Sequence, residues 1–151
     1  MKIFILRHGQ AEAYQTSDAA RGLTEKGIAD TQQIISNNVQ SLSSVERIYA
    51  SPLLRAQQTA EIATRLLTME SFITTVCLEP ESALERLFSF LEKISTTDIL
   101  LVSHLPLVGI LANRLCGFSQ DRIQFNTSSL IGIECDFPAE RMGSLFLEKH
   151  V

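Results

Sequence analysis

The amino-acid sequence predicts an α/β fold with a mostly parallel central sheet flanked by helices. Short apolar runs typical of strands alternate with longer segments whose apolar residues recur at helical spacing. Three of the apolar runs end directly in polar or charged residues, as parallel strands do at the edge where open α/β sheets bind ligands. The chain has 151 residues without a repeat or a linker, so a single domain is expected over 1–151.

The first half of the chain is expected to hold two strands, each followed by a helix. The apolar runs at 3–6 and 47–50 predict buried strands. Amphipathic helices are expected at 23–39, with Thr24 as the N-cap, and at 51–67. The apolar residues expected to pack against the sheet are Ile28, Ile34, Ile35 and Val39 in the first helix, and Leu53, Leu54, Ile62, Leu66 and Leu67 in the second.

The second half continues the alternation and then changes to two strands in succession. The expected elements, in chain order, are a strand at 72–78, a helix at 81–94, a strand at 98–102 and a helix at 104–117. The last two apolar runs, at 129–134 and 144–148, flank a polar segment at 136–143. A polar segment of this kind is typical of a turn, so a β-hairpin is expected at the end of the chain.

Composition and charge exclude several classes of function. Apolar residues make up 45% of the chain and charged residues 20%, which is ordinary for a globular protein outside a membrane. The net charge of -4 argues against general binding to nucleic acid or to an anionic membrane. Any anion must therefore be bound by a local cluster. No apolar stretch approaches the roughly 20 residues that span a bilayer.

The cysteines and the N-terminus indicate the compartment. Cys77, Cys116 and Cys135 are widely spaced and form no C-x-x-C pattern, which is typical of a reducing environment. The apolar run after Lys2 ends at Arg7, too early for the core of a signal peptide. We therefore expect a cytoplasmic protein, and we expect it to be a monomer.

Polar residues at three strand ends are expected to converge on one site. Arg7 and His8 follow the first strand, and His104 follows the fourth. Arg55 is expected in the first turn of the helix after the second strand, because Pro52 is typical of a first helical position. The carboxyl ends of parallel strands lie at one edge of a sheet, so these side chains should lie close together.

These residue types suit phosphoryl transfer. The planar guanidinium groups of Arg7 and Arg55 can each bind two phosphate oxygens, and a neutral histidine nitrogen can attack phosphorus. Ser51, Ser103 and Thr127 are candidate hydrogen-bond donors to phosphate. A helix cap at Ser51 and a simple turn at Thr127 are the alternative roles.

No metal site or cofactor is expected. The chain has no H-E-x-x-H, no paired cysteines and no dense loop of Asp and Glu, which are the usual local signatures of metal binding. Activity should therefore survive a chelator.

The segments "RHG", "SPLLRAQQTA" and "VSHLP" resemble the motifs of the histidine phosphatase superfamily, which has the phosphoglycerate mutase-like fold. The resemblance covers nearly the whole chain and is strongest to the SixA-type phosphohistidine phosphatases of bacteria. It implies that His8 is the nucleophile that becomes phosphorylated. It also implies that Arg7, Arg55 and His104 complete the phosphate pocket. Arg21, in "RGLTEKG", would be a further contact to phosphate or substrate, with a solvated loop arginine as the alternative.

The sequence leaves the substrate open. Members of the superfamily that cleave phosphate esters generally carry an Asp or Glu that protonates the leaving alkoxide. Glu79, Glu81 and Glu85 are candidates here, but acids near a helix start also have a structural role. An imidazole leaving group hardly needs a proton, which favours a phosphohistidine-bearing protein in bacterial phosphotransfer signalling. A small phosphomonoester as substrate, and a non-catalytic phosphohistidine-binding module, are the alternatives.

Overall fold

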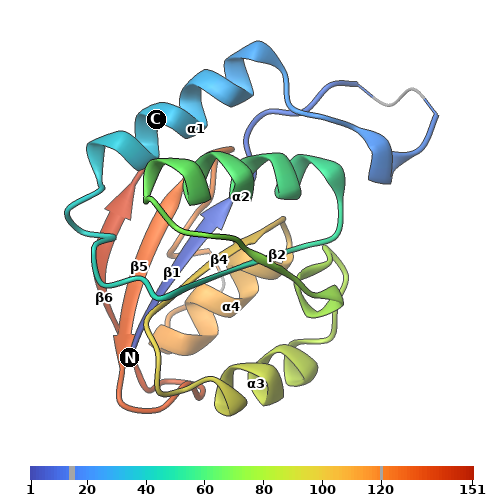
Figure 1. Cartoon of the computed structure of the whole chain (residues 1–151). Helices are drawn as coiled ribbons and strands as arrows, with labels where there is room; N and C mark the ends of the chain where they lie inside the picture. Colours follow the sequence, from blue (N-terminus) through green and yellow to red (C-terminus); the bar gives the residue numbers. More distant parts are fainter. Residues whose placement is uncertain (14–15, 120) are drawn as a thin grey trace.

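The structure is a computed structural model that describes residues 1–13, 16–119 and 121–151. In these ranges a six-stranded sheet forms the centre, in the order β3-β2-β4-β1-β5-β6 (Figure 1). The strands are β1 (Lys2–Arg7), β2 (Arg47–Ala50), β3 (Ile73–Thr74), β4 (Ile99–Ser103), β5 (Leu130–Cys135) and β6 (Gly143–Lys149). The first four are parallel, whereas β5 and β6 run antiparallel to their neighbours. The predicted α/β class with a mostly parallel sheet is confirmed.

The α-helices of the described ranges cover both faces of this sheet. They are α1 (Glu25–Asn37), α2 (Leu54–Leu66), α3 (Leu84–Lys93) and α4 (Leu107–Cys116). Helices α1 and α2 lie on one face, and α3 and α4 lie on the other (Figure 1). Two short 3-10 helices, Asp18–Ala20 and Val76–Leu78, lie in the connections.

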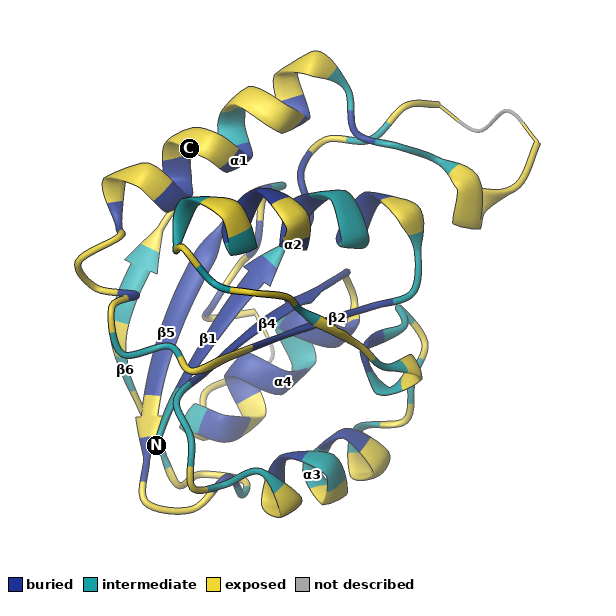
Figure 2. Cartoon of the chain, viewed as in Figure 1, coloured by how far each residue is buried: buried dark blue, intermediate teal, exposed yellow. Residues whose placement is uncertain are grey.

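Strand β1 is buried on both of its faces, and Figure 2 shows the same for its neighbours in the middle of the sheet. Ile3 and Ile5 belong to the core under α3 and α4, whereas Phe4 and Leu6 belong to the core under α1 and α2. Successive side chains of a strand point to opposite faces, so one strand contributes to both halves of the core. The core therefore fixes the strand whose end leads into His8.

Small side chains make the contact between α2 and the sheet. Ala56, Ala60 and Ala63 are fully buried there, and Ile62 is 7% exposed. The prediction that leucines line this face was wrong for Leu54, which is 37% exposed. Alanine has little apolar surface, so it hardly marks a buried helix face in the sequence. Its small size nevertheless lets a helix lie close to a sheet.

The buried face of α1 is narrower than predicted. Ile34 and Ile35 are buried as expected, and Thr24 is the N-cap. Ile28 and Val39 are instead 39% and 42% exposed. Val39 lies beyond the end of α1, so helical spacing no longer turns its side chain toward the sheet.

The segment 72–78 differs from the predicted strand. Only Ile73–Thr74 forms a strand, and the chain then enters the 3-10 helix Val76–Leu78. Thr75 caps this turn by accepting a hydrogen bond from a backbone N–H two residues later, which competes with strand pairing. Helix α3 begins at Leu84, three residues later than predicted.

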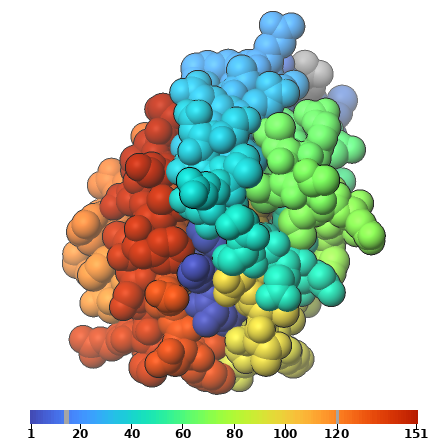
Figure 3. Space-filling view, turned by 60° about the vertical axis from the view of Figure 1, so that its left-hand side comes forward, coloured from blue at the N-terminus to red at the C-terminus, as the bar shows by residue number. Residues whose placement is uncertain are grey.

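The C-terminal part forms the predicted β-hairpin. Strands β5 and β6 pair antiparallel, with a bulge between Gly132 and Ile133. In the space-filling view β6, coloured red, forms one flank of the molecule (Figure 3). Among the helices of the described part of the chain, none is both long enough and apolar enough to cross a membrane.

Candidate active site

Neighbouring strand ends bring the predicted residues to one edge of the sheet. Strands β1 and β4 are parallel neighbours with Arg7 opposite Ser103, so His8 and His104 follow at the same edge. The centroids of the His8 and His104 rings are 4.9 Å apart. Arg55 comes from the first turn of α2, which follows the adjacent strand β2.

The backbone of His8 is held from several sides. Its N–H donates to the carbonyl of Ser103 at 3.0 Å, and its carbonyl accepts from the N–H of Ser128 at 3.2 Å. The next N–H, of Gly9, donates to the hydroxyl of Thr59 at 3.1 Å. Contacts from β4, from α2 and from the loop before β5 therefore fix the position from which the His8 ring extends.

A close contact between two glycines explains why glycine follows His8. A Cβ atom at Gly9 would lie 2.6 Å from the carbonyl oxygen of Gly27, and one at Gly27 would lie 2.1 Å from that of Gln10. Both distances are too short for any side chain. The two glycines let the loop after β1 pass directly over the first turn of α1.

The geometry of the His8 ring assigns its tautomer. Nδ1 lies 2.7 Å from the carbonyl oxygen of Gly9. A carbonyl can only accept a hydrogen bond, so Nδ1 carries the proton and Nε2 holds the lone pair. The free lone pair of the His8 ring is therefore on Nε2.

Burial and charge keep His8 neutral. The side chain is 8% exposed, and burial is the main cause of a pKa lowered from 6.5 to about 4. The hydrogen bond to Gly9 acts in the opposite direction, and the charges of Arg55, Arg7 and Arg21 lower the pKa further. At pH 7 the ring is a neutral base beside three cations.

His104 is also a neutral, buried ring. It is 2% exposed, and burial together with His8 and Arg55 lowers its pKa from 6.5 to about 3. Neither ring nitrogen has a hydrogen-bond partner among the described residues. A buried polar group without a partner costs about 1–3 kcal/mol.

Two of the arginines bind an acid that the sequence had not singled out, Asp18. Arg55 Nη2 lies 3.1 Å from Asp18 Oδ2, and Arg21 Nη1 lies 3.0 Å from Asp18 Oδ1. Arg55 Nη1 also donates to the backbone carbonyl of Asp18 at 2.9 Å. The only sequence signal for this cluster is an acid three residues before Arg21, and that spacing is common on any turn or helix surface.

Arg7 has one buried donor without a partner among the described residues. Its Nη1 donates to the carbonyl of Phe125 at 2.9 Å, whereas its Nε is buried without a partner among the described residues. Burial lowers the pKa of the guanidinium. Arginine nevertheless remains charged in proteins, so Arg7 presents a fixed positive charge beside His8.

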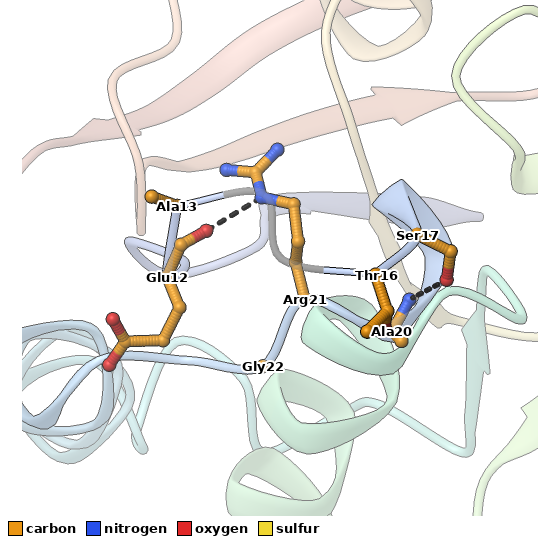
Figure 4. A pocket seen from close by; sticks show the side chains of 7 residues that line it. All are labelled: Glu12, Ala13, Thr16, Ser17, Ala20, Arg21 and Gly22. Atoms are coloured by element: carbon orange, nitrogen blue, oxygen red, sulfur yellow. Dashed lines mark hydrogen bonds between the residues drawn. The ribbon is translucent and has the colours of Figure 1, made fainter.

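Arg21 borders a small hollow of about 100 Å³ (Figure 4). The hollow is lined by Glu12, Ala13, Thr16, Ser17, Ala20, Arg21 and Gly22. Arg21 Nε donates to the backbone carbonyl of Glu12 at 2.6 Å, and the Glu12 carboxylate points away from the guanidinium. The side chain of Arg21 is 29% exposed. It is therefore fixed by two acceptors rather than freely solvated.

Ser51 is buried, but the predicted helix start was wrong. Helix α2 begins at Leu54 with Leu53 as its N-cap, so Ser51 is not the cap and Pro52 is not the first helical residue. Leu53 keeps an extended backbone, which delays the helix, and its N–H donates to Ser51 Oγ at 3.3 Å. Arg55 still lies in the first turn.

Ser103 and Thr127 also lie next to the residues at this sheet edge. The Ser103 hydroxyl donates to the carbonyl of Leu78 at 2.7 Å, which commits its proton. Thr127 is half-buried in the loop before β5, and the N–H of the next residue, Ser128, donates to the carbonyl of His8. Contacts from Ser51, Ser103 and Thr127 to phosphate remain predictions.

Of the three candidate acids, Glu79 is the least exposed. It is half-buried and directly follows Leu78. The carbonyl of Leu78 accepts a hydrogen bond from Ser103, which precedes His104. Glu81 and Glu85 are exposed and lie further along the chain. Glu79 is therefore the acid to test first.

The site as a whole suits phosphoryl transfer. Within the described ranges, no three His, Cys, Asp or Glu side chains are grouped so that they could hold a metal ion. The described side chains combine a nucleophilic lone pair on His8, a second neutral imidazole and fixed guanidinium groups. Such groups stabilise the charge on transferring phosphoryl oxygens during attack by nitrogen.

Known proteins are similar to this chain in both sequence and fold. The model of the histidine phosphatase superfamily (branch 1) matches residues 3–80. The chain is 32% identical over 141 residues to phosphohistidine phosphatase SixA of Escherichia coli (strain K12), covering 90% of this chain and 86% of that protein. It is 34% identical over 128 residues to the phosphohistidine phosphatase SixA homolog of Haemophilus influenzae, covering 78% of each.

A solved structure gives the same result. The protein histidine phosphatase SixA complexed with tungstate matches with a TM-score of 0.89 and 29% identity, over 98% of this chain and 96% of that chain. The resemblance predicted from the motifs is confirmed.

Proposed function

Because the chain belongs to the histidine phosphatase superfamily, we propose that it hydrolyses phosphohistidine on a partner protein through a phosphorylated His8. One observation carries this proposal: a neutral His8 holds its Nε2 lone pair among the charges of three arginines. Two relatives named for phosphohistidine hydrolysis align with at least 78% of the chain, which supports the same substrate class. Residues 1–151 would act as a single catalytic domain.

In the first step, Nε2 of His8 attacks phosphorus in line with the phosphorus–nitrogen bond of the substrate. A bond forms between His8 and phosphorus while the substrate bond breaks, and its electron pair stays on the substrate nitrogen. When the other nitrogen of that ring is already protonated, the ring leaves as neutral imidazole. The step therefore needs no carboxylic acid as proton donor.

In the second step, water attacks the phosphorus of phosphorylated His8. The oxygen of water joins phosphorus, its proton passes to solution, and the bond to Nε2 breaks. Its electron pair returns to Nε2, which restores the neutral ring with the proton still on Nδ1. The hydrogen bond from Nδ1 to Gly9 holds the ring in the same tautomer before and after turnover.

The remaining residues act on the phosphoryl oxygens. The guanidinium groups of Arg7 and Arg55 bind oxygens that carry the charge in both steps. The N–H of neutral His104 donates to a further oxygen, because that ring has no partner among the described residues. Ser51, Ser103, Thr127 and Arg21 are proposed as additional contacts to phosphate or substrate.

We also propose a cellular setting. The protein would act as a monomer in the cytoplasm, on a phosphohistidine of bacterial phosphotransfer signalling. The wide spacing of Cys77, Cys116 and Cys135, without a C-x-x-C pair, supports a reducing compartment. Sedimentation of the purified chain and cell fractionation would test the oligomeric state and the location.

The test compares two substrates. Phosphate release is measured from a protein carrying phosphohistidine and from a small phosphomonoester, with wild type, His8→Ala and Glu79→Gln. We expect faster release from phosphohistidine, no release by His8→Ala, and nearly wild-type release by Glu79→Gln. Unchanged turnover in His8→Ala would refute the mechanism.

The place of Glu79 supports a second candidate, a phosphomonoesterase with the same nucleophile. A proton donor contributes about 10² to 10⁴ in rate when an alkoxide leaves. Better turnover of the ester, lost in Glu79→Gln, would favour this function. Tight binding of the phosphorylated protein without release of phosphate would instead indicate a binding module.

A further inference from the structure

The carboxylate of Asp18 occupies donors on Arg55 and Arg21, two residues proposed to bind phosphate. One carboxylate oxygen binds Arg55 at 3.1 Å and the other binds Arg21 at 3.0 Å. A phosphoryl group also presents two oxygens to guanidinium groups, and an N–H that donates to Asp18 cannot donate to phosphate at full strength. Asp18 and phosphate are thus rivals for the same donors.

Asp18 is an anion under all ordinary conditions. The hydrogen bond from Arg21 is the largest cause of a lowered pKa, and Arg55 adds to it. The negative charge of Asp18 also acts on His104, whose pKa it raises against the stronger opposing effects. The charge of Asp18 therefore reaches the centre of the site.

The carboxylate is placed so that it can leave. The side chain of Asp18 is 57% exposed, whereas that of Arg55 is 7% exposed. Asp18 is the first residue of a short 3-10 helix that Ser17 caps, and Arg55 also binds its backbone carbonyl. The side chain can thus rotate toward solvent while the backbone contact keeps Asp18 beside Arg55.

We propose that Asp18 is a built-in competitor that weakens the binding of phosphate to Arg21 and Arg55 and so speeds the release of the product. The proposal rests on the proposed function, because release of phosphate matters only if phosphate is the product. When phosphate binds, the two carboxylate contacts break. When phosphate leaves, the carboxylate takes its place on both arginines.

If Asp18 instead supports phosphate binding, the change in anion affinity on removing its charge has the opposite sign. If Asp18 merely positions the arginines for phosphate, removal of its charge leaves them poorly oriented, and anion binding weakens. If Asp18 competes, removal of its charge strengthens anion binding. Ion pairs made by an exposed carboxylate are weak, and two of them together correspond to a change of about tenfold in affinity.

The experiment measures binding without turnover. The affinities of orthophosphate and of tungstate, a tetrahedral dianion, are measured by calorimetry for the whole chain as wild type, Asp18→Asn and Asp18→Ala. Glu12→Gln is the matched control. It removes a negative charge from the same loop, but the side chain of Glu12 points away from the Arg21 guanidinium (Figure 4). Circular dichroism checks that each variant is folded.

We expect both Asp18 variants to bind either anion about tenfold more tightly, and Glu12→Gln to change affinity less than about twofold. The use of two variants keeps the test valid if one of them fails to fold. Unchanged or weaker binding in the Asp18 variants would refute the proposal. So would an equal gain in Glu12→Gln, since that outcome reflects only the net charge of the loop.

A kinetic measurement separates this proposal from the proposed function. If the chain hydrolyses phosphohistidine, inhibition by orthophosphate should also become about tenfold stronger in Asp18→Asn. If wild type shows no hydrolysis but the calorimetric difference is found, the function fails while the competition at the arginines stands. If hydrolysis is found without a calorimetric difference, only the competition fails.

Discussion

Acid should destabilise this protein through its two buried imidazoles, and His8 allows a quantitative test. In the folded chain the pKa of His8 is lowered from 6.5 to about 4. Between these values the unfolded chain binds a proton that the folded chain does not, so the free energy of unfolding falls as the pH falls. Each pH unit below 6.5 costs about 1.4 kcal/mol, which gives about 3 kcal/mol at pH 4.5.

The perturbation that isolates this effect is His8→Gln, because glutamine cannot be protonated but can still donate to a carbonyl. Urea unfolding is followed by circular dichroism at pH 7 and pH 4.5. Wild type should lose about 3 kcal/mol more than His8→Gln between the two values. Removal of His8 also relieves His104, whose pKa it helps to lower, and this acts in the same direction.

Replacement of the exposed third histidine gives the control. The ring of His150 is 36% exposed, and His150→Gln should keep most of the acid sensitivity of wild type. Equal losses in wild type and His8→Gln would show that His8 is not held neutral by its surroundings. The assignment of Nε2 as a free nucleophile at pH 7 would then be refuted as well.

Three further predictions concern the arginine pocket, metal ions and the glycine contact. Arg55→Lys should lower kcat/KM for a phosphohistidine protein by about 10²-fold, because lysine lacks the planar fork, and steady-state kinetics would detect it. Phosphate release should be the same with and without EDTA; a loss restored by one divalent ion would contradict this. Gly27→Ala should destabilise the fold by about 1–3 kcal/mol, since its Cβ would lie 2.1 Å from Gln10. Gly109→Ala is the control in thermal unfolding, because the nearest atom to its Cβ is a side-chain carbon at 3.4 Å, and it should be neutral or stabilising.

The strand ends of the site could be predicted because they depend on local pattern. A polar residue directly after an apolar strand lies at the sheet edge whatever the rest of the chain does, and this placed Arg7, His8 and His104 correctly at one edge. Arg55 was also placed correctly, although α2 starts later than Pro52 suggested. The catalytic roles of these residues remain predictions.

Features that depend on packing or on loop conformation could not be predicted. Asp18 lies 37 residues from Arg55, and no periodicity connects a loop acid with a helix. The alanines of α2 carry too little apolar surface to mark a buried face. Strand β3 is shorter than predicted because the Thr75 hydroxyl accepts a hydrogen bond from the backbone. The sequence alone does not show whether this bond or further strand pairing forms.

The anchoring of His8 leaves the following loop open to change in length. Ala11 and Leu23 form an antiparallel bridge, and the N–H of Glu12 donates to the carbonyl of Gly22 at 2.8 Å. The base of the loop is thus closed by its own backbone pairs, while His8 is held by contacts from other elements. Doubling the length of a flexible loop costs only about 0.6 kcal/mol. Insertions beyond Glu12 can therefore bring new side chains to this edge during evolution without moving His8.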